Sequence, residues 1–370
     1  MQLLKNKLKT DLSDICEKVV DGHRLDYKDG IRLFESSDIL AIGYLANMVR
    51  ERINKNRAYY IVNRHINYTN ICKNRCKFCA FSRNQDEEGA YQMSIKEILD
   101  NASHIIHDNA TELHIVGGLH PELGLDYYVD MISAIHERFP DVHIQAFTAV
   151  EIVHFAEISG MSTYETLEKL KDAGLGSLPG GGAEVFSTDV RKELCPEKLS
   201  GDEWLNTMRT AHNLGMRSNA TMLYGHIEKN GDRVNHLLKL RELQDETGGF
   251  MSFIPLAFHP KNTDLKDFSS TAGILDLKML AIGRLMLDNF DHIKAFWIML
   301  GIKLAQISLS FGVDDIDGTV AEERITHSAG AETPEALTVD EIKSLIEETG
   351  REPVERDTLY NRVNQKSSIN

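Results

Sequence analysis

The sequence predicts an α/β protein built on a (βα)8 barrel of the TIM type. From residue 58 onward, short apolar runs alternate with amphipathic helical stretches, a pattern typical of parallel strands joined by helices. Eight such runs lie within residues 58–313, and eight strand–helix units in about 250 residues favour a closed barrel over an open doubly wound sheet. No linker rich in proline, serine or glycine divides the chain.

The chain is predicted to fall into three parts. Residues 1–57 form an N-terminal helical extension, because SSDILAIGYLANMVRERIN repeats apolar residues at helical spacing after a candidate cap at Ser37 or Asp38. Residues 58–313 form the barrel, and residues 314–370 form a C-terminal extension that packs on it. The strands are predicted at 58–69, 112–118, 142–151, 175–182, 217–225, 251–258, 292–300 and 307–313.

Four predicted helices open on a capping box, in which Ser or Thr is followed three residues later by Glu. They span residues 94–108, 162–174, 200–215 and 338–350, with the pairs Ser94/Glu97, Ser162/Glu165, Ser200/Glu203 and Thr338/Glu341. Apolar periodicity predicts further helices at 126–139, 231–248 and 274–287.

Composition narrows the function classes. The 370 residues carry a net charge of −15, which argues against general binding to nucleic acid or to a membrane surface, since both need basic patches. The N-terminal residues lack the apolar core of a signal peptide, and no window is long and apolar enough to span a bilayer. A cytoplasmic protein is expected, with reduced thiols that favour metal binding or chemistry over disulfides.

Three of the five cysteines gather in NYTNICKNRCKFCAFSR, as Cys72, Cys76 and Cys79 in the spacing C-x3-C-x2-C. The cluster follows the first predicted strand, at the end of a barrel where chemistry is placed. A zinc-binding structural module would need a fourth ligand, and Cys16 and Cys195 are remote in sequence. Three thiolates on one loop suit a [4Fe–4S] cluster with one open iron. Zinc, or thiols with no metal, remain the alternatives.

This motif, with the aromatic Phe78 before its third cysteine, resembles the radical S-adenosylmethionine (SAM) superfamily. The resemblance implies a [4Fe–4S] cluster whose open iron is chelated by the amine and carboxylate of SAM. It further implies that one electron from the cluster cleaves the sulfonium and releases a 5′-deoxyadenosyl radical. Phe78 is then expected to form a wall beside the adenine.

Several residues after the next strands are candidates for binding SAM. Gly117 and Gly118 match the Gly-Gly-Glu turn of the superfamily, although Leu119 stands where the acidic residue would be. Thr148 and Glu151 follow the third strand, where they would meet a ribose or a substrate proton. After the fourth strand, Gly181 and Gly182 let the backbone approach a ligand, and Glu184 would bond ribose hydroxyls. Helix N-terminal charge is the alternative role of Glu184.

Other polar residues are candidates for contacting the substrate or for catalysis. They lie at or near the predicted strand ends, and they are His65, Asn67, His120, Arg217, Asn219, Tyr224, His226 and His259. A polar SNAT inside an apolar strand suits a barrel interior that contacts a polar ligand.

Motifs along the whole chain narrow the resemblance. HIVGGLHP, SLPGGGAEVF, NATMLYGHIE, FIPLAFHP and PVERDTLYN are similar to those of the aminodeoxyfutalosine synthases of the futalosine route to menaquinone. That family adds the 5′-deoxyadenosyl radical to 3-[(1-carboxyvinyl)oxy]benzoate, a dicarboxylate aryl enol ether, and after rearrangement and decarboxylation releases aminodeoxyfutalosine and methionine. The dehypoxanthine futalosine cyclases and the deazaflavin-forming enzymes that couple tyrosine to a ribityl-pyrimidine share most of these motifs and stay alternatives.

The resemblance also implies partners. A reducing protein of the flavodoxin or ferredoxin type would deliver the electron, and the substrate would be a small molecule rather than nucleic acid or membrane. The sequence leaves open whether the chain forms a homodimer.

Overall fold

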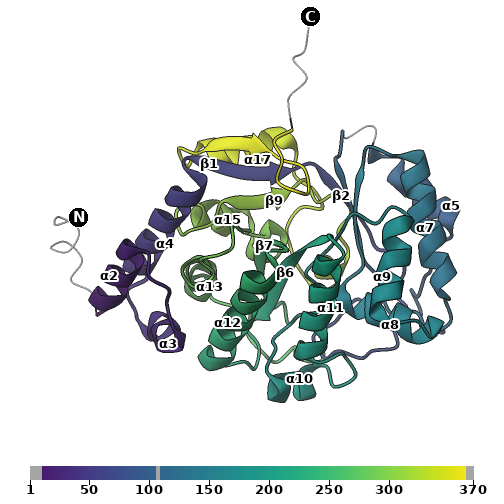
Figure 1. Ribbon diagram of the computed structural model, residues 1–370, viewed down its shortest axis with the longest axis horizontal. Coiled ribbons are helices and arrows are strands. Elements are labelled where there is room, and N and C mark those ends of the chain that lie inside the picture. Colours follow the sequence, from purple (N-terminus) through teal and green to yellow (C-terminus); the bar gives the residue numbers. More distant parts are fainter. Residues whose placement is uncertain (1–10, 106–108, 364–370) are drawn as a thin grey trace, which may run out of the picture.

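The computed structural model describes residues 11–105 and 109–363. Its core is a seven-stranded parallel sheet in the order β2-β3-β4-β5-β6-β7-β8, with helices packed outside (Figure 1). The strands follow one another in sequence order and the sheet curls, which confirms the predicted α/β core of the TIM type. A second parallel sheet has the order β10-β1-β9.

The strands are shorter than predicted. Their bounds are β1 Arg57–Ile61, β2 Asn63–Ile66, β3 Glu112–Ile115, β4 His143–Ala146, β5 Ser177–Leu178, β6 Arg217–Tyr224, β7 Phe250–Ala257, β8 His292–Ile293, β9 Asp315–Gly318 and β10 Glu352–Glu355. The first predicted strand divides after Ile61, so that β1 joins the second sheet and β2 begins the main one. The predictions at 142–151 and 292–300 each contain a short strand followed by a helix.

The eighth predicted strand, 307–313, is not a strand, because α15 occupies Ile302–Ser308. The next segment links the two edges of the main sheet instead. Parallel bridges join Lys294 to Asp315 on the β8 side and Arg64 to Ala321 on the β2 side. The amide of Ala295 donates to the Asp315 carbonyl at 2.8 Å, and the amide of His65 donates to the Ala321 carbonyl at 2.9 Å.

The helices surround the sheet. They are α2 Ser13–Asp21, α3 Tyr27–Glu35, α4 Ile39–Asn54, α5 Ile95–Ala102, α7 Leu125–Arg138, α8 Ala149–Ser159, α9 Thr163–Asp172, α10 Thr188–Leu194, α11 Gly201–Asn213, α12 Asn230–Thr247, α13 Gly273–Met286, α14 Trp297–Leu300, α15, α16 Ile325–Ser328 and α17 Val339–Glu347. All four predicted capping boxes are present, which fixes where α5, α9, α11 and α17 begin. Residues 106–108 of the first predicted box helix lie outside the described residues.

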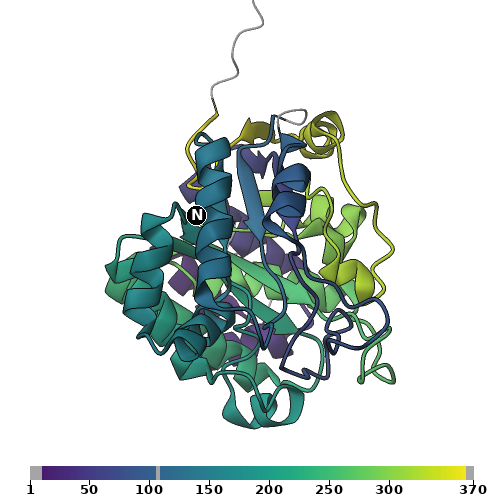
Figure 2. The same ribbon diagram turned by 90° about the vertical axis from the view of Figure 1, so that its right-hand side faces the viewer.

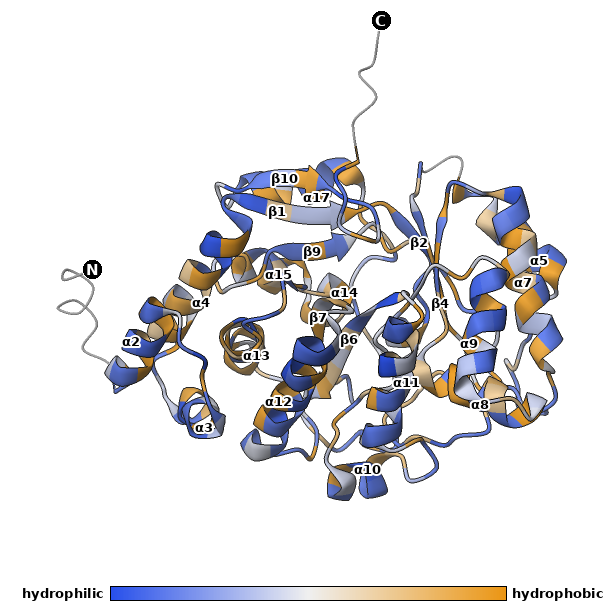
Figure 3. Ribbon diagram, viewed as in Figure 1, coloured by the Kyte–Doolittle hydropathy of each residue, from blue (hydrophilic) through white to orange (hydrophobic). Residues whose placement is uncertain are grey.

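The two ends of the chain pack on the barrel. Helix α4 lies against α13, and α3 lies against α12. Figure 3 shows α13 as largely hydrophobic, as expected for a helix enclosed between α4 and β7. Strand β10 pairs with β1 and packs beside α17. No helix in the described part of the chain is long and apolar enough to cross a bilayer.

Candidate functional site

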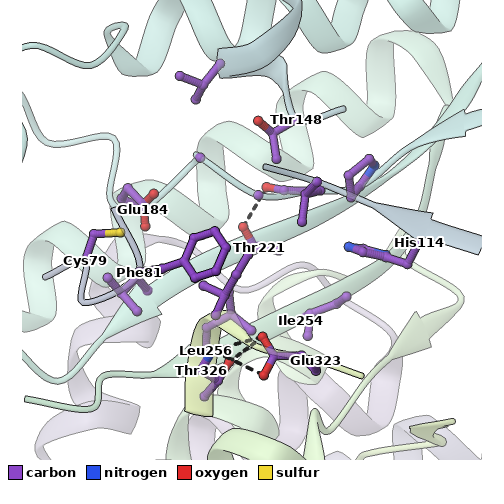
Figure 4. A pocket seen from close by; sticks show the side chains of 18 of the residues that line it. Cys79, Phe81, His114, Thr148, Glu184, Thr221, Ile254, Leu256, Glu323 and Thr326 are labelled. Carbon is purple, nitrogen blue, oxygen red and sulfur yellow. Dashed lines mark hydrogen bonds between the residues drawn. The ribbon is translucent and has the colours of Figure 1, made fainter. Parts of the chain in front are cut away.

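A cavity opens at the carboxyl ends of the main-sheet strands, and all three clustered cysteines line it. The long loop after β2, dark blue in Figure 2, covers this end of the barrel and carries the cysteines. Figure 4 shows side chains from the cysteine loop, the sheet and the segment around α16 facing one another across the cavity. In a barrel of parallel strands, chemistry is expected at this end.

Backbone hydrogen bonds hold the cysteine loop from three sides. The amide of Cys72 donates to the Arg83 carbonyl at 3.1 Å, that of Lys73 to the Leu119 carbonyl at 2.9 Å, and that of Lys77 to the Leu194 carbonyl at 2.9 Å. Gly118 permits this approach, since a Cβ there would lie 2.2 Å from the Ile71 carbonyl oxygen. The turn after β3 therefore fixes the path of the loop into the first cysteine.

The cysteine thiols suit an iron–sulfur cluster better than a single ion. Within the described residues, no three His, Cys, Asp or Glu side chains gather closely enough to hold one metal ion. Thiolates that bind different corners of a cubane need not converge on one point, and three soft thiol donors on one loop fit three irons of a [4Fe–4S] cluster. Burial raises the pKa of the Cys72 thiol, and binding to iron would hold it as a thiolate.

Cys195, remote in sequence from the cluster, lies beside it in the fold. It hydrogen-bonds to Cys76, and this contact together with burial raises the pKa of the Cys76 thiol. The neighbouring Glu197 carboxylate accepts from the Arg75 amide at 2.7 Å. Sequence reasoning missed this contact because α10 and the segment after it come from a long connection between β5 and β6. Only the folded chain brings the segment 194–198 against the cysteine loop.

Glu184 and Phe78 share a partner that sequence reasoning also missed. The Lys198 ammonium lies 2.6 Å from Glu184 Oε1 and 5.4 Å from the centre of the Phe78 ring. All three residues line the cavity. Glu184 adopts a left-handed φ of 47°, a conformation that non-glycine residues rarely take. Glu184 is therefore a buried ion-pair member at the cluster end rather than a plain helix N-terminal charge.

The Glu151 carboxylate accepts hydrogen bonds from residues that follow three strands, β2, β3 and β4. Its Oε1 accepts from the Tyr68 hydroxyl at 2.7 Å and from the Gly117 amide at 3.0 Å. Its Oε2 accepts from the Thr148 amide at 2.7 Å and the Thr148 hydroxyl at 2.8 Å, closing a capping box for α8. Burial raises the pKa of this carboxyl to about 6. Thr148 and Glu151, which were predicted to contact a ligand, thus form hydrogen bonds that link the turn after β3 to the start of α8.

We expect Glu151→Gln to destabilise the protein by about 1–3 kcal/mol, because one carboxylate oxygen becomes an NH2 group facing a buried donor. The free energy of unfolding in urea measures the effect. Glu165→Gln is the matched control, since Glu165 closes the same kind of box on the exposed surface and should change stability by about 0.5 kcal/mol or less. Equal losses in both variants would contradict the role given to Glu151.

The Gly-Gly-Gly turn after β5 packs against β6 and α11. The Gly180 carbonyl accepts from the Thr221 hydroxyl at 2.6 Å, and the Gly181 carbonyl accepts from the Trp204 indole at 3.1 Å. A Cβ on Gly180 would lie 2.8 Å from backbone atoms of β6. Gly182 has a φ of +84°. The absence of side chains on these glycines lets the backbone of the turn pack closely against β6 and form part of the cavity wall.

The structure brings some substrate-contact candidates to the cavity and not others. His65, Asn219 and His259 line it, with the His259 Nε2 2.9 Å from the Met299 carbonyl oxygen. The remaining five are not among its lining residues: Asn67, His120, Arg217, Tyr224 and His226. Arg217 is exposed at the amino end of β6, far along the strand from the cysteines. The Tyr224 hydroxyl donates to Asp276 at 2.8 Å.

The other three candidates bind protein groups near the cavity. The Asn67 amide donates to the Val116 carbonyl at 3.1 Å. His120 Nδ1 accepts from the Glu122 amide at 3.1 Å, and His226 Nε2 lies 3.0 Å from the Leu223 carbonyl oxygen. These contacts order the loops around the cavity.

A short helix from the C-terminal part closes one side of the mouth. Glu323, Ile325, Thr326 and Ala329 line the cavity, and the Glu323 carboxylate accepts from the Thr326 amide at 2.9 Å. His327 Nδ1 donates to the Glu323 carboxylate at 3.2 Å, and this hydrogen bond raises the pKa of His327 to about 9 and helps to hold the segment in place.

Comparisons with known proteins agree with this geometry. Residues 66–240 match the model of the Radical SAM superfamily, and residues 247–369 match that of the CofH/MqnC C-terminal region. The chain is 47% identical to aminodeoxyfutalosine synthase of Thermus thermophilus, over 95% of this chain and 96% of that protein. It is 45% identical to the enzyme of the same name from Streptomyces coelicolor, over 94% and 92%.

Relatives with a second activity are nearly as similar. The 5-amino-6-(D-ribitylamino)uracil–L-tyrosine 4-hydroxyphenyl transferase of Methanopyrus kandleri is 41% identical, over 86% of this chain and 88% of that protein. Among solved structures, methylornithine synthase superposes with a TM-score of 0.74 at 19% identity, over 91% of this chain and 96% of that chain. The hydrogenase maturase HydG from Carboxydothermus hydrogenoformans superposes with a TM-score of 0.71, over 95% and 80%. At such identities the structural matches show the fold alone.

Proposed function

This chain belongs to the radical SAM enzymes with a CofH/MqnC C-terminal region, and from that premise we propose that it is an aminodeoxyfutalosine synthase. Its cofactors are a [4Fe–4S] cluster and SAM, as in the rest of the superfamily. The proposed acceptor is 3-[(1-carboxyvinyl)oxy]benzoate, whose enol-ether carbon takes the 5′-deoxyadenosyl group, with loss of carbon dioxide or bicarbonate and release of methionine. When bound by Cys72, Cys76 and Cys79, the cluster would supply the electron for cleavage of the sulfonium of SAM.

The observation that carries the proposal is the 47% identity to a synthase over nearly the whole length of both chains. The 4-hydroxyphenyl transferases are 40–42% identical to this chain. The synthase reaction is therefore favoured by a difference of a few per cent in sequence identity, and not by a motif found in synthases alone. Transfer of the tyrosine-derived group to a ribityl-pyrimidine is the second candidate reaction, and hydrogen abstraction by a cyclase is the third.

Within the proposed reaction, Cys72, Cys76 and Cys79 would hold the cluster. Phe78 and Glu184, joined through Lys198, would flank the adenosyl part of SAM. Gly117 and Gly118 would offer backbone oxygens to its ammonium, and Gly181 and Gly182 would let it lie against the turn after β5. Asn219, His65 and His259 would face the acceptor. The apolar side chains of Ile254, Leu256 and Phe258, which line the cavity, would help to keep water and hydrogen-atom donors from the radical.

We further propose the surroundings in which the enzyme works. All five cysteines, which lie within the described residues, carry free thiols, as expected in a reducing compartment. A flavodoxin- or ferredoxin-type protein would supply the electron. Nucleic acid and membrane play no part in the proposed reaction.

Product analysis tests the proposal. Dithionite-reduced, cluster-loaded enzyme is incubated with SAM and the aryl enol ether, and in parallel with SAM, tyrosine and the ribityl-pyrimidine. In the first reaction only, we expect mass spectrometry to show a product that contains the adenine of SAM, together with free methionine and little 5′-deoxyadenosine. Turnover in the second reaction alone would instead assign the chain to the transferase, and stoichiometric 5′-deoxyadenosine in a third reaction, with SAM and dehypoxanthine futalosine, would assign it to the cyclase.

A further inference from the structure

Polar side chains form a belt around the inside of the barrel, below the cysteines. The polar belt consists of His65 on β2, His114 on β3, Gln145 on β4, Asn219 on β6, Lys294 after β8 and Asp317 on β9, and all six line the cavity. His65, His114 and Gln145 are direct neighbours in strand register. Strand geometry directs the residues on β2, β3, β4 and β6 into the cavity, since alternate residues of a strand face the same side.

Most residues of the polar belt are hydrogen-bonded to another residue of the belt. His114 Nδ1 lies 3.1 Å from Gln145 Oε1, and Asn219 Nδ2 donates to the same oxygen at 3.4 Å. The rings of His65 and His114 stack at 4.5 Å, and burial lowers the pKa of both. Burial thus favours the neutral form of both imidazoles. The cation of the belt is Lys294.

Lys294 is the one cavity lysine with a loose partner. Among the described residues that line the cavity, the lysines are Lys198 and Lys294, and there is no arginine. Lys198 is tied to Glu184 at 2.6 Å. The Lys294 ammonium makes a long contact of 3.5 Å with Asp317 Oδ1, and the Lys294 side chain is 8% exposed. A buried ammonium with one long contact keeps donors for another anion.

Two carboxylates, those of Asp317 and Glu112, face Lys294, and its contact with Asp317 is 3.5 Å long. Burial raises the pKa of Asp317, so this carboxyl binds a proton more readily than a surface aspartate. Burial opposes the charge of Glu112, yet the nearby Lys294 ammonium helps to hold the pKa of this carboxyl below its usual value, and its Oε1 accepts from the Asn63 side-chain amide at 3.2 Å. A ligand carboxylate would therefore give this buried ammonium a short charge-assisted hydrogen bond in place of its long contact with Asp317.

The cavity between the cysteines and the polar belt suits an aromatic ring. In Figure 4, Cys79 and Glu184 lie at one end and His114 at the other, with Phe81, Thr221 and Ile254 between them. Leu223, Leu256 and Phe296 add apolar surface to this middle part. An aromatic ring bound there would place the reacting end of the acceptor near the cysteines and the substituent at the opposite side of the ring near the polar belt.

We propose that Lys294 binds the ring carboxylate of the acceptor and selects an anionic aryl acid over an uncharged heterocycle. This inference rests on the proposed function and adds the residue that determines acceptor specificity. Asp317 positions Lys294 in the absence of the acceptor, and the ligand carboxylate takes over this contact when it binds. A charge-assisted hydrogen bond of this kind, buried, is worth roughly 10- to 100-fold in affinity.

Calorimetric binding to the oxidised, cluster-loaded enzyme with SAM tests the inference without turnover. The probes are 3-[(1-carboxyvinyl)oxy]benzoate and its analogue with a ring carboxamide. We expect the wild type to prefer the carboxylate, and Lys294→Gln to lose about 10- to 100-fold in affinity for the carboxylate while binding the carboxamide as before. Lys294→Arg should retain most of the preference. Lys239→Gln, on the exposed face of α12, is the control and should change neither affinity.

The outcomes separate the inference from the proposed function. Equal losses for both probes in Lys294→Gln, or no loss for either, would overturn the role of Lys294 while leaving the synthase reaction in place. A wild-type enzyme that binds SAM but neither probe would overturn the synthase assignment itself.

Discussion

Replacing Cys72 with alanine removes the visible absorbance of the cluster and all cleavage of SAM. Each of the three cysteines would hold one iron of the cluster. Loss of one thiolate leaves two ligands on a cluster that already has one open iron. Cys76→Ala and Cys79→Ala should behave in the same way, because all three thiols line the same cavity.

Iron and sulfide analysis, together with an assay for 5′-deoxyadenosine or adenosyl product, measures this loss. Cys16→Ala is the matched control, since Cys16 lies in α2, outside the cavity, and is half-buried. We expect about four irons and four sulfides per chain in the wild type and in Cys16→Ala. One zinc per chain without sulfide would favour the structural-module alternative, and intact turnover in Cys72→Ala would refute the radical mechanism.

Replacing Arg284 with methionine destabilises the fold by about 3–5 kcal/mol, because it removes the guanidinium from the buried Asp314 carboxylate and leaves His292, at 2.6 Å, as its side-chain partner. The side chains of Arg284 and Asp314 are fully buried in an ion pair. The Arg284 guanidinium also donates to the carbonyls of Gly312 and Phe290, each at 3.0 Å. The Asp314 carboxylate accepts in turn from the Ile293 amide at 2.8 Å. The pair therefore ties α13 and β8 to the segment that leads into β9.

Urea unfolding of the two proteins gives the difference in free energy. Arg24→Ala is the matched control, since Arg24 pairs with Asp245 and Asp288 on the surface with 48% of its side chain exposed. Exposed pairs of this kind contribute about 1 kcal/mol or less. Similar losses in the two variants would show that Arg284 contributes no more than a surface pair, contrary to our account.

Much of the fold could be predicted because its cues are local. The boxes at Ser94, Ser162, Ser200 and Thr338 each satisfy amides at a helix start within four residues, and all four are present. The box of Thr148 and Glu151 follows the same rule, but the apolar residues around it resemble a strand, and the start of α8 was assigned to β4. Segment 315–318 was missed as a strand because DIDG is polar, whereas its pairing is fixed by β1 and β8.

The residues of the candidate site that could be predicted are those that belong to a recognisable motif at the end of a predicted strand. Cys72, Cys76, Cys79, Phe78 and Glu184 all line the cavity. Lys198 and Cys195 escaped prediction because their contacts with the cysteine loop cross a connection of more than a hundred residues. Lys294 read as a flank of an apolar run, yet it lines the cavity. Arg217, two residues from Asn219, faces solvent at the far end of the same strand.

Labelled SAM provides the most direct test of the account. Enzyme is reduced with dithionite and given SAM carrying ¹³C at the 5′ carbon, together with 3-[(1-carboxyvinyl)oxy]benzoate. The ¹³C spectrum of the product should show the labelled carbon bonded to a carbon of the acceptor, with one methionine released per product. Recovery of the label only as the methyl group of 5′-deoxyadenosine would contradict adenosyl transfer by this chain.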